Sequence, residues 1–189
     1  MTDTSRRPFL LFVAGALLYF AAAAIAGRLV KADDPLATLE LLMPAFGLPY
    51  LLLGRRRGWK TALYFLLLVP AIHYAAVFAA IESTNGRGSG WLPGATGGLV
   101  GSFLSFAALL ALGLARPRSA PLMGFGIVLL TLLGAIGVSK MDAFAGTALD
   151  DEGLLLVLYL PWQIVFGLLL SRLLRAPADI GLVAEPAPA

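Results

Sequence analysis

Long apolar runs are the feature that most restricts how this chain can fold. Six of them occupy residues 9–27, 36–53, 61–81, 96–115, 121–138 and 154–174. A helix that crosses a bilayer needs about 20 predominantly apolar residues, and each run is long enough. The chain is also 59% hydrophobic and only 13% charged, far from the balance of a soluble domain. We therefore predict an all-α, polytopic integral membrane helix bundle with six transmembrane helices.

A cluster of positive charge between the second and third runs sets the orientation. Arg55, Arg56, Arg57 and Lys60 crowd this loop, and basic loops stay on the cytoplasmic side. With both termini cytoplasmic, ten of the 14 lysines and arginines lie on that side and four on the other. The predicted layout is a cytoplasmic leader (1–8), one transmembrane domain (9–175) and a cytoplasmic tail (176–189). We expect a multi-pass protein of a bacterial plasma (inner) membrane.

The leader supports a second interpretation. Residues 5–10 resemble a twin-arginine export signal and residues 24–26 resemble a signal-peptidase site, so cleavage would remove the first span. The apolar run is longer than a usual signal core, and Arg6 and Arg7 also suit positive-inside anchors. We therefore expect an uncleaved first span.

Polar side chains inside the predicted spans are the candidate ligand-binding residues. Glu40 is the only carboxylate within a span and His73 is the only histidine, and intramembrane ionisable residues are functional candidates. Tyr74 follows His73, and Gln163 needs a hydrogen-bonding partner in hydrocarbon. Structural roles stay open, because Glu40 lies near the outer headgroups and His73 could simply bond a neighbouring helix. Prolines in the same runs are expected to shape a cavity.

Small residues recur every four positions in the fourth run, at Gly97, Gly101 and Ser105. Such a stripe forms a smooth groove that lets another helix approach closely. We expect it to pack inside the bundle. An interface to a separate protein is the alternative.

Other chemistries find no support in the sequence. The absence of cysteine excludes disulfides and thiolate sites, and a lone histidine cannot build a metal site. We expect no metal, no cofactor and, without a basic–aromatic face, no nucleic-acid partner. The expected partner is the lipid bilayer, with another membrane protein or a homo-oligomer left open. No nucleotide-binding motif is present, so an ATP-driven step would need another chain.

Two glycine-rich patches carry a resemblance to a known family. One is GATGGLVG at residues 94–101, entering the fourth run, and the other is the turn LGRRRG at residues 53–58. With six spans and both ends inside, they are similar to the substrate-binding subunits of energy-coupling-factor vitamin transporters. The resemblance covers these patches alone, and no binding residue is carried over from it.

Three classes of function are compatible with these features. The first is a subunit that binds or transports a small solute in the outer half of the bundle, through Glu40, His73, Tyr74 and Gln163. The second is a non-catalytic accessory or assembly subunit of a larger membrane complex, whose glycine stripe docks a partner. The third is an intramembrane enzyme, which is least favoured because no nucleophile–base or metal motif is present.

Overall fold

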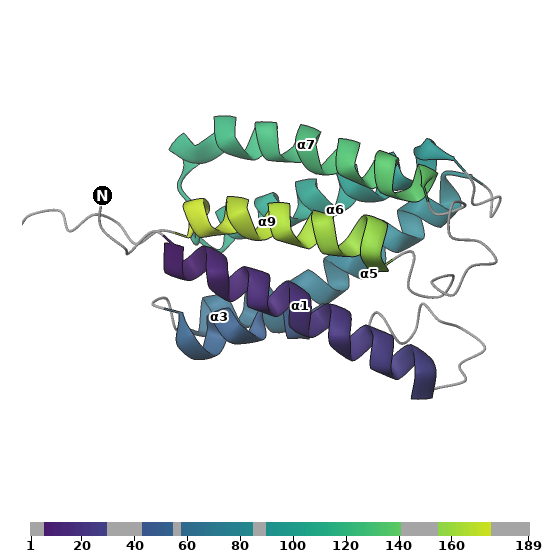
Figure 1. Cartoon of the computed structure of the whole chain (residues 1–189). Helices are drawn as coiled ribbons and strands as arrows, with labels where there is room; N and C mark the ends of the chain where they lie inside the picture. Colours follow the sequence, from purple (N-terminus) through teal and green to yellow (C-terminus); the bar gives the residue numbers. More distant parts are fainter. Residues whose placement is uncertain (1–5, 30–42, 55–57, 85–89, 141–154, 175–189) are drawn as a thin grey trace, which may run out of the picture.

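The computed structural model describes residues 6–29, 43–54, 58–84, 90–140 and 155–174, and every regular element in these ranges is helical (Figure 1). The elements in chain order are α1 (Arg6–Leu29), η2 (Met43–Phe46), α3 (Leu48–Leu53), α4 (Trp59–Leu63), η3 (Tyr64–Leu68), α5 (Val69–Glu82), α6 (Trp91–Ala111), η4 (Pro117–Ser119), α7 (Ala120–Ser139), η6 (Leu155–Tyr159) and α9 (Leu160–Leu173). The all-helical class predicted from the apolar runs is confirmed for these parts of the chain.

Four helices within these ranges are long and apolar enough to cross a membrane: Arg7–Ile25, Trp59–Glu82, Trp91–Ala111 and Pro117–Ser139. The sixth predicted run gives a shorter apolar helix, Val157–Leu173. The first seven residues of the second run, 36–42, lie outside the described residues, and its described part is divided between the short helices η2 and α3. Six spans and cytoplasmic termini therefore stay predictions.

Large apolar side chains point outward along the long helices. Leu17 on α1, Phe78 on α5 and Phe125 on α7 are each more than half exposed. Contiguous apolar surface of this kind is rare on a soluble monomer. It suits contact with lipid tails, so the outer surface supports a membrane protein as strongly as the helix lengths do.

The helix α6 begins and ends earlier than the predicted run of residues 96–115. It starts at Trp91 because Pro93 falls in the first turn, where its missing N–H costs no helical hydrogen bond. It ends at Ala111, and Gly113 follows with a φ of 67°. Glycine adopts this left-handed conformation without a steric penalty, so it is a common helix terminator.

Helices α6 and α7 make the most extensive contact of any two described elements. A Cβ atom added to Gly94 would collide with the carbonyl of Gly134, and one added to Gly134 would collide with the carbonyl of Gly94. One turn further along α6, a Cβ on Gly98 would lie 2.8 Å from the oxygen of Leu130. Absent side chains thus allow backbone contact, which is how small residues hold membrane helices together.

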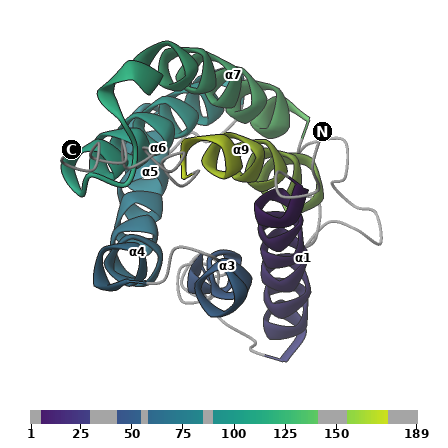
Figure 2. The same ribbon diagram turned by 90° about the vertical axis from the view of Figure 1, so that its left-hand side faces the viewer.

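Helix α9 joins this pair to the N-terminal helix. It packs against both α7 and α1, and Figure 2 shows it between them in the end view. Its residue Phe166 is 1% exposed, and its ring lies 5.9 Å from those of Phe46 on η2 and Phe106 on α6. This aromatic contact connects the two sides of the bundle.

Two widened helical turns precede prolines. The π-helical turn η3 comes just before Pro70, and the π-helical turn η6 comes just before Pro161. Proline cannot donate to the carbonyl four residues earlier, and its ring crowds that carbonyl. A π-turn is one way to accommodate this, and π-turns are frequent at functional sites.

Candidate functional site

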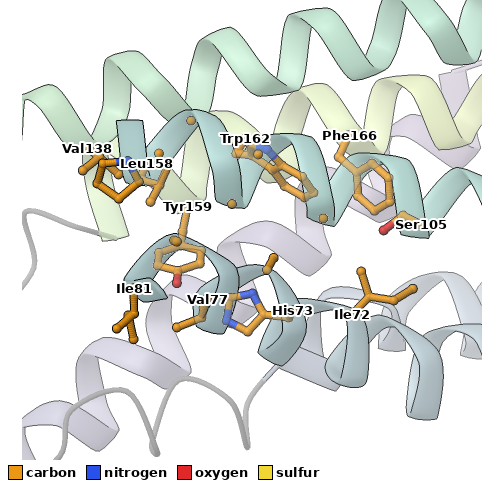
Figure 3. A pocket seen from close by; sticks show the side chains of 18 of the residues that line it. Ile72, His73, Val77, Ile81, Ser105, Val138, Leu158, Tyr159, Trp162 and Phe166 are labelled. Atoms are coloured by element: carbon orange, nitrogen blue, oxygen red, sulfur yellow. The ribbon is translucent and has the colours of Figure 1, made fainter. Parts of the chain in front are cut away.

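A cavity of about 270 Å³ lies between α5, α6, α7 and the η6–α9 segment (Figure 3). On α5 its lining residues extend from Val69 to Thr84, and on α6 from Pro93 to Ser105. At 1.5 Å per helical residue, this is a groove rather than a round pocket. Its lining is almost entirely apolar.

The groove occupies the end of the bundle opposite the basic loop. Its lining includes the C-terminal turn of α5 at Ile81, the first turn of α6 at Pro93 and the C-terminal turn of α7 at Val138. Lys60 on α4 and Arg118 on η4 lie at the opposite ends of the apolar helices Trp59–Glu82 and Pro117–Ser139. Under the predicted orientation, with basic residues inside, the groove lies in the outer half of the membrane.

Its two long walls differ in chemistry. On α6, Gly97 and Gly101 contribute no side chains, so the backbone itself forms the surface. On the η6–α9 side the groove is lined by Tyr159, Trp162 and Phe166, and the last two rings have centroids 5.0 Å apart. The two walls meet at Gly101, where an added Cβ atom would lie 3.9 Å from Cζ2 of Trp162.

His73 contributes the imidazole of the groove, from the middle of α5. Its ring lies 5.4 Å from that of Tyr159, edge to face. Its Nε2 atom is buried and finds no hydrogen-bond partner among the described residues. A buried polar atom left unpaired costs roughly 1–3 kcal/mol. The His73 side chain lines the groove, while its Nε2 atom is covered by the surrounding protein.

Two of the other predicted ligand-binding residues, Tyr74 and Gln163, do not line the groove with His73. Tyr74 is 57% exposed and Gln163 is fully buried, and neither lines the cavity. Glu40 lies outside the described residues. Of these four residues, the structure places one in the cavity.

The glycine stripe faces α5. A Cβ atom on Gly97 would lie 3.3 Å from that of Ala80, and one on Gly101 would lie 3.3 Å from that of Ala76. Ser105 is buried at the deeper end of the groove, where its backbone carbonyl accepts a 3.4 Å hydrogen bond from the hydroxyl of Tyr64. The stripe therefore both packs against a helix of the same chain and lines the cavity.

Of the basic anchors, Lys60 is exposed and lies 5.8 Å from the ring centroid of Trp59. Such a pair suits the membrane interface, where amphipathic rings and lysines gather. Arg55, Arg56 and Arg57 lie outside the described residues.

Sequence reasoning did not select the aromatic wall. Tyr159, Trp162 and Phe166 follow a spacing of three and four residues, which places them on one face of a helix. That periodicity was available in the sequence. The π-turn Leu155–Tyr159 that precedes Pro161 was not, because it follows from how the chain packs.

Within the described ranges, no group of three His, Asp or Glu side chains could hold a metal ion. An apolar groove with a single imidazole offers shape, ring stacking and one hydrogen bond.

Comparison of the chain with known protein families, with curated proteins and with solved structures found no match. The fold and the groove therefore define the class of this protein, a helical protein with four candidate membrane spans in its described residues.

Proposed function

We propose that this protein is a membrane subunit that binds, and in a larger system would transport, a small and largely apolar molecule in the groove. The observation that carries the proposal is the almost entirely apolar cavity of about 270 Å³ between α5, α6, α7 and the η6–α9 segment, with the His73 side chain in its lining. Ligand pockets have this composition, and this volume is near the lower limit of about 300–1,000 Å³ for drug-sized ligands.

The position of the groove supports a ligand that arrives from the membrane or from the outer surface. The groove extends from the C-terminal end of α5 and the N-terminal end of α6 toward the middle of the bundle. Contacts with the aromatic rings of the groove would contribute about 0.5–1.5 kcal/mol each.

A substitution that fills the groove tests the proposal. Val77 lines the cavity on α5, whereas Val128 on α7 is 60% exposed toward lipid. Val77→Phe should exclude the ligand, and Val128→Phe, the same change on the outer surface, should not. Mass spectrometry of organic extracts from the purified proteins reads this out directly.

The expected result is a small molecule in near-stoichiometric amount in wild type and Val128→Phe, and its loss from Val77→Phe. A ligand at one hundred times its dissociation constant also stabilises the folded state by about 2.7 kcal/mol, so the filled variant should lose that stabilisation. An empty wild-type protein, or equal content in both variants, would contradict the proposal.

The alternative of an accessory subunit has less support from these residues. Its docking surface was the glycine stripe, and α5 already packs against Gly97 and Gly101. A bulky residue at either position would disturb the bundle itself. An accessory role would need another face, and mass spectrometry of co-eluting proteins would test for it.

A further inference from the structure

We propose that the seam between α1 and α9 holds an anionic phospholipid at one end of the bundle. Arg7 and Arg172 bind its phosphate, and its acyl chains lie on lipid-facing leucines one turn deeper. This site is separate from the groove and does not rest on the proposed function. Three observations support it, namely the common level of the two arginines, the charge around them and the apolar surface that continues from them into the membrane.

Helices α1 and α9 run antiparallel, and two contacts fix their alignment. Near the start of α1, a Cβ atom added to Gly167 would lie 2.6 Å from that of Phe12. Further along α1, the ring centroid of Tyr19 lies 6.0 Å from that of Tyr159. Seven residues forward on α1 thus correspond to eight residues backward on the η6–α9 segment. The start of α1 therefore meets the end of α9 at one end of the bundle (Figure 1).

This alignment brings Arg7 and Arg172 to the same level. Arg7 lies five residues before Phe12, and Arg172 lies five residues after Gly167. At 1.5 Å per helical residue, each arginine is about 7.5 Å beyond that contact, toward the same end. Both side chains are exposed. Two guanidinium groups on neighbouring helices can therefore bind one phosphate, whose oxygens accept the paired N–H donors that guanidinium presents.

The charge around this pair is positive in the part of the chain that the structure describes. Glu82 is the sole acidic residue in the described ranges, and it lies in the last turn of α5, at the other end of the bundle. Lys60 and Arg118 add further positive charge to the end that carries the arginine pair, which faces the viewer in Figure 2. Under the predicted orientation this end meets the cytoplasmic leaflet, whose anionic lipids attract such charge. An anionic headgroup is therefore the complementary partner.

The apolar surface next to the arginines favours a lipid over a free phosphate ion. On α1, Leu10 lies three residues after Arg7 and is 58% exposed. On α9, Leu168 lies four residues before Arg172 and is 38% exposed. Residues three or four apart share one face of a helix, so each arginine lies one turn above a lipid-facing leucine. A ligand that contacts both features has a negative charge at one end and hydrocarbon at the other, as an anionic phospholipid does.

Native mass spectrometry of the full chain tests the site, with dioleoylphosphatidylglycerol as the anionic probe and dioleoylphosphatidylcholine as its zwitterionic match. We expect one phosphatidylglycerol per chain, bound more tightly than phosphatidylcholine. Arg7→Gln or Arg172→Gln should weaken its binding about fivefold, and the double variant about thirtyfold, the contribution of one and of two cations at a charged membrane surface. Arg118→Gln, which removes one charge of the same end outside the seam, should change it by less than about twofold. Val77→Phe, which fills the groove, should leave it unchanged.

Four results would overturn the proposal. Equal binding of the two lipids would remove the role of the headgroup charge. An equal loss in Arg118→Gln and in the seam variants would show a diffuse attraction to the whole basic end. Displacement of the lipid by millimolar inorganic phosphate would make this a site for a free anion, and loss of the lipid in Val77→Phe would place it in the groove. The single variants keep the test decisive if the double variant proves unstable.

Discussion

The close contact between α6 and α7 yields the sharpest prediction about stability. Replacing a glycine of α6 or α7 by alanine adds one methyl group whose surroundings differ from site to site. At Gly124 a new Cβ would meet nothing within 4 Å. At Gly98 it would lie 2.8 Å from the oxygen of Leu130 and 3.0 Å from the Cα of Thr131. Both of those atoms belong to backbone, which cannot turn aside as a side chain can.

The magnitudes follow from two opposing terms. Alanine gains about 0.5–1 kcal/mol over glycine in a helix because the unfolded chain has less freedom to lose. Overpacking a close contact costs about 1–3 kcal/mol. Gly124→Ala should therefore be neutral or slightly stabilising, Gly98→Ala should lose about 1–2 kcal/mol net, and Gly94→Ala, which collides with the Gly134 carbonyl, should lose the most.

The assay is unfolding of the detergent-solubilised variants by increasing sodium dodecyl sulfate, followed by circular dichroism. The midpoints should fall in the order Gly124→Ala, Gly101→Ala, Gly98→Ala and Gly94→Ala, with Gly101→Ala near wild type because its nearest neighbour is the Cβ of Ala76 at 3.3 Å. Lipid offers no hydrophobic force between helices, so lost close packing is not compensated. If Gly94→Ala and Gly124→Ala unfold together, the described α6–α7 contact is wrong.

Three further predictions concern the interior and the orientation. Tyr19→Phe should leave the free energy of unfolding unchanged or raise it by up to about 1 kcal/mol, because the buried Tyr19 hydroxyl has no hydrogen-bond partner in the described ranges. A marked loss of stability in the same denaturation assay would mean that the hydroxyl has a partner. Phe166→Ala should lose about 3 kcal/mol because this ring is 1% exposed between two helices, whereas Phe125→Ala at a 62% exposed site should change little; equal midpoints would argue against the described core. Because the chain has no cysteine, a single introduced cysteine reports its own side of the membrane. Thr84→Cys should react with an impermeant maleimide on intact cells, and Ser119→Cys should react only after permeabilisation. The reverse pattern would invert the predicted orientation.

Much of the helical layout could be predicted from the sequence because lipid leaves few alternatives. Backbone groups in hydrocarbon must bond within their own segment, so a long apolar run becomes a helix. The predicted run of residues 61–81 corresponds to the helix Trp59–Glu82, and residues 121–138 lie within Pro117–Ser139. The observed helix ends differ most from the predicted ones at α6, where Pro93 fits the first turn and Gly113 follows the last.

The set of residues that line the candidate site was harder to predict from the sequence. His73 could be singled out because an imidazole in an apolar run is costly. The sequence could not distinguish its surroundings from those of Tyr74, the next residue, because adjacent positions on a helix differ by about 100° in direction and nothing local shows which direction faces a neighbour. The aromatic wall likewise acquires its role only from the helix opposite.

The sequence by itself determined that the chain is helical and apolar enough for a membrane, which positions can pack closely, and where an unusual polar group lies. Those properties depend on hydrogen-bond satisfaction and residue size within one segment. Only the tertiary structure decided that Gly97 faces α5, that Gly94 meets α7, and that His73 opens into a groove opposite Tyr159 and Trp162. The reason is physical: contacts between distant segments depend on the rotation of each helix about its axis, which is fixed when the helices pack together.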